Sequence, residues 1–249
     1  MRKSMWLGMG LTVLAIALLV KLGFWQLQRA AEKQQLFDQF QQGEAQQQTP
    51  VPLQSIEQLQ DLEQYQPVTI SGRFLPAPIL LLDNQVWQGQ VGYQVIGLFE
   101  PTTAARLIGV SLGWVAAGSD RSQLPVLSLP TQPMVISGLV YTPSRGGFRL
   151  SEQVVTEAAT NAAQTEVIRI QRFDPTALTN LLSLPLADRQ LLLAESEAWG
   201  WPRAWQPQVM SPAKHQAYAL QWFSLALACL IVFTIAARSN KKKNNKECP

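Results

Sequence analysis

Histidine and cysteine are scarce in this chain of 249 residues. It has one histidine, His215, and two cysteines, Cys229 and Cys248. A single histidine excludes a two-histidine metal site or a bis-histidine haem within one chain. The cysteines lie in an apolar run and in a basic tail, so no disulfide framework is expected. Without a Cys-x-x-Cys pair, thioredoxin-like redox chemistry, thiolate copper delivery and covalent c-type haem attachment are excluded as well.

Catalytic motifs are also lacking. The sequence has no Gly-x-Ser-x-Gly, no phosphate-binding P-loop and no dinucleotide-binding glycine motif. The carboxylates show no metal-ligand spacing, and His215 lies beside an apolar run, where it is poorly placed to serve as the base of a hydrolase. We therefore expect that the protein is not an enzyme. The alternative, a membrane-anchored enzyme, would need a deep pocket with paired carboxylates.

Positive charge is missing from the middle of the chain. Residues 28–216 hold 12 Lys and Arg against 16 Asp and Glu, although the whole chain has a net charge of +3. The excess of basic residues comes from the two ends. A nucleic-acid-binding body needs basic residues gathered on a folded face, so we expect no nucleic-acid partner.

Two long apolar runs are present, at residues 6–27 and 217–237, and only Lys21 interrupts them with a charge. Each has the roughly 20 residues that a helix needs to cross the hydrocarbon of a bilayer. The first run could instead be a cleaved signal peptide, but no small-x-small cleavage site follows it. We therefore expect two transmembrane helices flanking an extracytoplasmic domain at residues 28–216.

Basic residues flank both spans on one side and predict the orientation. Arg2 and Lys3 precede the first span, and Arg238 with Lys241–Lys243 follows the second. By the positive-inside rule, residues 1–5 and the basic tail at 238–249 face the cytoplasm, or the matrix of a mitochondrion. The tail is interpreted as a topology signal that contacts anionic lipid. No transit-peptide-like leader precedes the first span, which favours an integral protein of a bacterial cell inner membrane.

The central domain is predicted to be mainly β, which makes the chain an α+β membrane protein. A glutamine-rich helix should continue from the first span through residues 26–48. Ser55 and Gln58 form a capping-box pattern that predicts a short helix at 55–65, and Asp174-Pro175 predicts a helix at 176–182. Alternating apolar residues predict strands at 67–74, 79–84, 92–99, 106–116, 134–141, 167–172 and 189–194.

Turn residues separate these strands. Asp83-Asn84 and Gly89 predict a hairpin loop, Gly118–Ser122 predicts another loop, and residues 144–147 predict an exposed turn. Residues 151–164 show no sustained period and are interpreted as a mobile excursion.

Charged and aromatic residues recur on one face of each span near its outer end. On the first helix the spacing is four residues; on the second it is three and then four, so each set forms one stripe. The predicted orientation places both stripes at the same depth. If the helices are neighbours, the stripes would form one half-buried site from Lys21, Trp25, Arg29, His215, Tyr218 and Trp222.

Two interpretations of these stripes stay open. One is an aromatic belt with snorkelling cations, which is common in membrane proteins. The other is a site for haem or another amphipathic planar ligand at the edge of the bilayer. In that case His215 would be the axial metal ligand, the aromatic rings would face the macrocycle, and Lys21 or Arg29 would meet the propionates.

Several motifs resemble the Surfeit locus protein one family of cytochrome c oxidase assembly factors. The stretch from Gly23 to Arg29, with Lys33 following, is similar to that family's Gly-x-Trp-Gln-x-x-Arg-x-x-x-Lys. The stretch from Lys214 to Phe223 is similar to its Asn-His-x-x-Tyr-Ala-x-x-Trp-Phe. Shorter resemblances lie at residues 68–74, 82–84, 89–93 and 138–140. The sequence departs from the family at Ser111-Leu112-Gly113-Trp114, where Asn-Arg-Gly-Trp is usual, and at Lys214.

This resemblance implies a role in oxidase biogenesis. It implies binding of haem, with haem A suspected, or its insertion into the oxidase catalytic subunit, and it makes His215 the candidate ligand. The implied partners are that catalytic subunit, other assembly factors and the lipid bilayer. The alternative is a cofactor-free, membrane-anchored scaffold for a respiratory complex.

Overall fold

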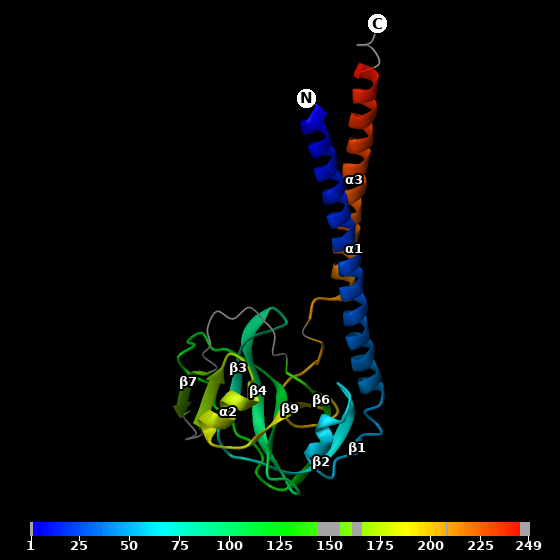
Figure 1. Cartoon of the computed structure of the whole chain (residues 1–249). Coiled ribbons are helices and arrows are strands. Elements are labelled where there is room, and N and C mark those ends of the chain that lie inside the picture. Colours follow the sequence, from blue (N-terminus) through cyan, green and yellow to red (C-terminus); the bar gives the residue numbers. More distant parts are fainter. Residues whose placement is uncertain (1, 144–154, 161–165, 208, 245–249) are drawn as a thin grey trace. The chain divides into compact units, whose positions relative to one another are not determined.

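The computed structural model describes residues 2–143, 155–160, 166–207 and 209–244. The chain divides into two compact units, Met1–Asp38 with Pro207–Pro249 and Gln39–Gln206, and each is described by itself (Figure 1). The turn expected at residues 144–147 lies outside the described residues.

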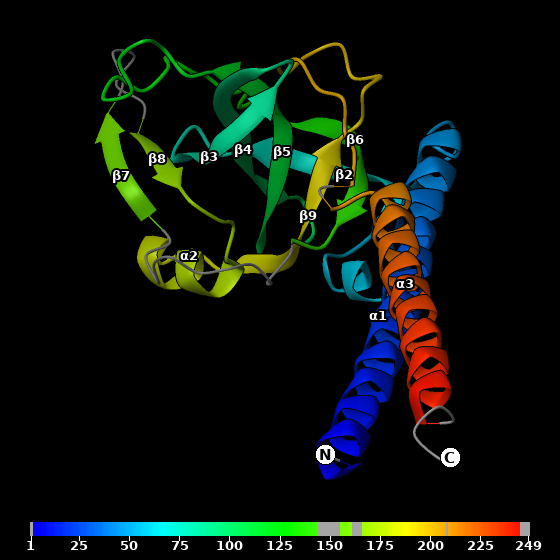
Figure 2. The same cartoon turned by 90° about the horizontal axis from the view of Figure 1, so that it is seen from above.

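The first unit is a pair of long helices. Helix α1 covers Arg2–Ala45 and α3 covers Pro212–Asn244, so both apolar runs are helical as predicted. Pro212 occupies the first turn of α3, where its missing N–H leaves no hydrogen bond unmade. Both helices are long and apolar enough to cross a membrane; the crossing itself stays a prediction. They run antiparallel and side by side (Figure 2).

The second unit is built around a closed β-barrel. The strands lie in the order β1-β2-β6-β9-β5-β4-β3-β8-β7, and β2 also pairs with β4, which closes a ring of β2, β6, β9, β5 and β4. Strands β3, β8 and β7 extend the sheet from β4 (Figure 2). The strands are β1 (Val51–Pro52), β2 (Pro67–Phe74), β3 (Ile79–Trp87), β4 (Gln90–Pro101), β5 (Leu107–Ala116), β6 (Met134–Tyr141), β7 (Val155–Thr160), β8 (Glu166–Ile170) and β9 (Leu186–Leu193).

Alternation along the strands separates two apolar cores. Leu81 and Val95 point into the barrel, whereas their neighbours Leu80 and Ile96 point to the opposite face. That second face is covered by α2 (Pro175–Leu182) through Leu178. A period of two residues per repeat is what assigns successive side chains to the two cores.

The sequence predictions for the strands are confirmed for β2 and β6 with identical bounds. The predicted cap of α2 is confirmed too, because the Asp174 carboxylate accepts a hydrogen bond from the N–H of Ala177 at 3.1 Å. The helix predicted at 55–65 is reduced to one 3-10 turn, η1 (Glu57–Gln60). There Gln58 Oε1 still accepts from the N–H of Ser55, which is one half of the capping box.

Three predictions were wrong in detail. Strand β3 does not stop at Asp83-Asn84 but continues to Trp87, because a register shift between Leu82 and Gln85 absorbs the irregular residues. The turn lies at Gln88 and Gly89, both with positive φ, as a two-residue hairpin requires, so the predicted loop is confirmed at Gly89 and wrong at Asp83-Asn84. Residues 155–160, inside the expected excursion, form strand β7 on the free edge of β8.

Arg189 ties the barrel to the segment that follows β1. Its side chain is buried and donates hydrogen bonds to the carbonyls of Leu59 and Leu62 and to the hydroxyl of Thr142. Burial lowers the pKa of the guanidinium. We expect Arg189→Met to lower the free energy of unfolding by about 2–4 kcal/mol, because it strands buried acceptors.

The matched control is Arg73→Met, since Arg73 is exposed and pairs only with Glu100. That change should cost less than about 1 kcal/mol. Urea unfolding of the full chain in detergent, followed by tryptophan fluorescence, measures both. Equal losses for the two variants would contradict a special role for Arg189.

Candidate functional site

Helices α1 and α3 meet along a seam of small residues. Ala30, Ala219 and Ala226 are buried on it. At its centre Gly23 lies against Phe223: a Cβ added at Gly23 would stand 2.5 Å from Cε1 of that ring. The rings of Phe24 and Phe223 meet edge to face with centroids 5.3 Å apart. The glycine therefore leaves room for the Phe223 ring, which a larger residue would displace.

His215 lies on this seam and has a partner from the other helix. Its Nδ1 is 2.8 Å from Oε1 of Gln26. An amide oxygen only accepts, so Nδ1 is the donor in this contact, and in the neutral imidazole the lone pair is then on Nε2. No hydrogen bond joins Nε2 to any residue within the described ranges. The arrangement is the one usual for metal-binding histidines, in which the second ring nitrogen donates to a carbonyl or carboxylate.

The stripe predicted on α1 faces away from the seam. Lys21 and Trp25 each lie two residues from Gly23, which is about 200° around the helix axis. Lys21 is exposed, and the side chain of Trp25 is 47% exposed. Arg29 is exposed as well; it pairs with Glu32 at 2.7 Å and lies over the Trp25 ring at 5.7 Å.

On α3 the predicted stripe is divided. Trp222 is half-buried beside Phe223, whereas Tyr218 is 45% exposed. The helices are therefore neighbours, as the predicted site requires, but its six side chains do not converge on one half-buried space. His215 and Trp222 lie at or near the seam, and the other four are exposed. The reason is helical phase: Gly23, Gln26 and Ala30 occupy the contact face of α1, and the cationic stripe occupies the face behind it.

Sequence reasoning missed Gly23, Gln26 and Phe223 as members of the site. The signal for two of them was present, because Gly23, Gln26 and Ala30 follow the i, i+3, i+7 spacing of one helix face. Small residues mark close helix contacts in membranes, and a polar residue on such a face bonds across it.

His215 is the sole histidine of the chain. One nitrogen ligand suits a cofactor that needs a single bond from the protein better than it suits a bare metal ion. Among the residues that the structure describes, no group of three or more His, Cys, Asp or Glu is placed to hold a metal ion. A haem brings four nitrogen ligands of its own and needs one axial nitrogen from the protein. A lone imidazole with a fixed tautomer fits that requirement.

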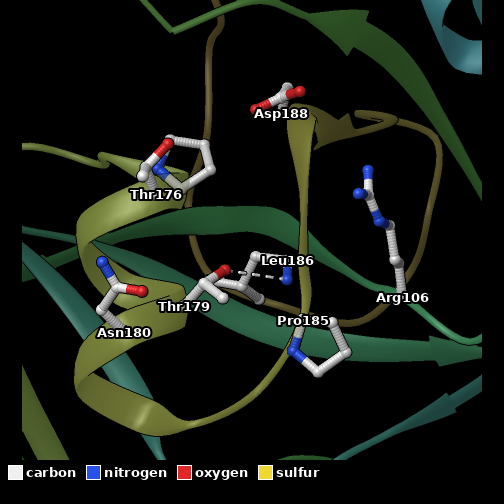
Figure 3. A pocket seen from close by; sticks show the side chains of 8 residues that line it. Arg106, Thr176, Thr179, Asn180, Pro185, Leu186 and Asp188 are labelled. Carbon is white, nitrogen blue, oxygen red and sulfur yellow. Dashed lines mark hydrogen bonds between the residues drawn. The ribbon is translucent and has the colours of Figure 1, made fainter.

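Cavities also lie elsewhere among the residues that the structure describes. One, of about 500 Å³, lies deeper along α1 and α3 between Met9, Thr12, Cys229 and Phe233 and is apolar. Another, of about 200 Å³, lies beside α2 (Figure 3). Its polar lining comes from Arg106, Thr176, Asn180 and Asp188, and its Thr179 hydroxyl already accepts a hydrogen bond from the N–H of Leu186 at 3.1 Å.

Comparisons with known proteins agree with these features. The model of the SURF1 family matches residues 13–227, a range that contains both the seam and the barrel. A SURF1-like protein of Rickettsia felis (strain ATCC VR-1525 / URRWXCal2) is 24% identical over 241 residues, which cover 91% of this chain and 95% of that protein. The resemblance seen at the ends of the chain is thereby confirmed. The chain belongs to the SURF1 family.

Proposed function

We propose that the protein holds haem, haem A in particular, through His215 at the outer edge of the membrane and assists its insertion into the catalytic subunit of cytochrome c oxidase. Membership of the SURF1 family implies a role in cytochrome oxidase assembly. The haem step is the more specific part of the proposal, and other assembly factors would share in the handover.

The contact between His215 and Gln26 carries this proposal. It orients the imidazole and, in the neutral ring, leaves the lone pair on Nε2, so the ring can bind iron without rearrangement. One axial bond also suits a carrier, since a ligand that must be released should be held by few bonds. When bound, haem would supply a planar apolar face. Trp222 is half-buried on α3, and its flat indole ring would offer a matching apolar face.

A different role is proposed for the exposed residues of the two predicted stripes. The outward direction of Lys21, Trp25 and Arg29 supports contact with lipid headgroups or a partner rather than with the propionates. Tyr218 is exposed on α3 and suits the same belt. We place them at the level where the two helices leave the bilayer.

The membrane arrangement is part of the proposal. We propose that α1 and α3 cross the inner membrane of a bacterium at residues 6–27 and 217–237, with both termini in the cytoplasm and residues 28–216 outside. Its support is the length and apolar composition of both helices and the basic residues at Arg2, Lys3 and Lys241–Lys243.

Changing Gln26 tests the contact with His215 on which the proposal rests. We expect Gln26→Leu to weaken haem binding by roughly 10- to 100-fold, the range found when the partner that orients a metal-binding histidine is lost. Gln26→Glu should keep most of the affinity, because a carboxylate also accepts from Nδ1. Absorbance titration of detergent-purified protein with haem measures both.

Gln28→Leu is the matched control. Gln28 is exposed on the same helix and bonds only along it, to Glu32 at 3.4 Å. Its loss should leave haem binding unchanged. Wild-type affinity in Gln26→Leu would show that the amide does not prepare the imidazole, and the proposal would lose its main support.

A further inference from the structure

The tip of the β3–β4 hairpin carries apolar side chains on both faces. Val86 and Val91 are direct cross-strand partners and are 66% and 46% exposed. On the other face the Trp87 ring lies 5.5 Å from the ring of Trp114. The indole N–H of Trp114 donates to the carbonyl of Gln85 at 2.9 Å, which fixes this ring on the hairpin. The exposed valines and these half-buried indoles thus form an apolar end, named here the hairpin tip.

The hairpin tip is also free of charge. Residues 84–99 contain no Asp, Glu, Lys, Arg or His, and the polar side chains of the turn are glutamines. The nearest charge along β3, Asp83, is buried and pairs with Arg121. An apolar tip without a charge can enter a low-dielectric environment without desolvating an ion, and exposed apolar patches mark contact surfaces.

The segment that precedes α3 in sequence is held against β5 of the barrel. The N–H of Trp114 donates to the carbonyl of Pro202 at 2.8 Å, and the N–H of Trp201 donates to the carbonyl of Leu112 at 3.0 Å. Arg203 holds the same segment through the carbonyls of Ala194, Trp199 and Trp201. Nine residues lie between Pro202 and Pro212, the first residue of α3, and over these ten Cα–Cα steps even a fully extended chain spans at most about 35 Å.

We infer that the hairpin tip inserts into the headgroup region of the bilayer, an inference that rests on the proposed crossing of that bilayer by α3. Tryptophan favours this zone because its ring is apolar and its N–H is polar, and the exposed valine pair would reach toward the acyl chains. Lipid is the occupant favoured by the lack of charge together with the short tether to a membrane helix. The contact would give the barrel a third membrane anchor besides α1 and α3 and would set which face it presents outward.

Site-specific fluorescence in vesicles tests this inference. In the full chain carrying Cys229→Ala and Cys248→Ser, a polarity-sensitive fluorophore is placed at Val86→Cys, at Val91→Cys or at Val135→Cys. Val135 is the matched control, because it is an exposed valine (59%) on β6. It pairs with β2 close to Pro101, which is at the end of β4 opposite to the hairpin tip. The protein is reconstituted into phosphatidylcholine vesicles with and without lipid that is spin-labelled near its headgroup.

Spin-labelled lipid should remove about half or more of the emission at positions 86 and 91, with a shift to shorter wavelength, and should leave position 135 unaffected. Emission at 86 and 91 that is as unquenched as at 135 would overturn the inference. So would shielding that develops only when purified oxidase catalytic subunit is added, which would assign the hairpin tip to a protein partner. Neither result depends on haem binding.

Discussion

Replacing His215 with alanine should leave the purified protein without bound haem. The chain has no second histidine to take over the axial bond, and Gln26, the partner of His215 across the seam, has an amide that is a poor iron ligand. The loss of affinity should exceed the roughly 10- to 100-fold expected for Gln26→Leu, since the ligand itself is removed rather than its partner. Absorbance of the protein titrated with haem, compared between wild type and variant, measures this.

A control variant and a rescue experiment test whether the loss of haem is due to the missing imidazole. Gln216→Ala changes an exposed neighbour on the same helix turn and should bind haem as the wild type does. Free imidazole added to His215→Ala should restore the spectrum of the bound haem, because it can occupy the position of the missing ring. In cells, oxidase purified from a strain that carries His215→Ala should contain less haem. Unchanged affinity together with normal oxidase would favour the cofactor-free scaffold.

The separate strands could be predicted because each one satisfies a local rule. Apolar residues alternate in β2 and β6, and both strands end at the predicted residues. The closing contact of the barrel could not be predicted in this way. Strands β2 and β4 meet over three residue pairs, from Gly72↔Pro101 to Phe74↔Phe99, and these pairs are distant in sequence. No local pattern distinguishes an open sheet from one that returns to its own first strand.

The short strand β7 was missed for a related reason. Its residues are small or polar, and it adds to the sheet through pairing with β8 rather than through a pronounced apolar alternation of its own. In β3 the opposite happened: Asn84, with φ of 57°, signals a turn locally, yet the ladder with β4 continues past it as an irregularity. In both cases tertiary pairing outweighed local preference.

The two helices that carry the candidate site could be predicted from the sequence, whereas the face of α1 that meets α3 could not. Spacing identified stripes on both helices, and the helices are neighbours at the depth of His215. Spacing alone does not say which stripe faces the partner helix. Charged and aromatic residues drew attention to Lys21 and Trp25, whereas the contact involves Gly23, which receives the Phe223 ring.

Gly23→Val should therefore separate the helices and remove the haem site without touching any proposed ligand. The added side chain would meet the Phe223 ring well inside contact distance. Overpacking of this kind costs about 1–3 kcal/mol, and relief by helix separation would draw Gln26 away from His215. If that energy is lost from haem binding, affinity falls roughly 5- to 150-fold. Haem titration, combined with the distance between spin labels on α1 and α3, measures the two effects together.

The chain supplies both a control and a rescue for this variant. Gly10 lies on the same helix with no atom within 4 Å of an added Cβ, so Gly10→Val should change neither helix distance nor haem affinity. Phe223→Ala in the Gly23→Val background removes the ring with which the valine side chain would clash. The helices should then come together again. If haem affinity recovers with the distance, the seam acts by setting the approach of Gln26 and His215. If the distance recovers while the haem remains unbound, the Phe223 ring itself contacts the cofactor, and its edge-to-face pairing with Phe24 is part of the binding surface.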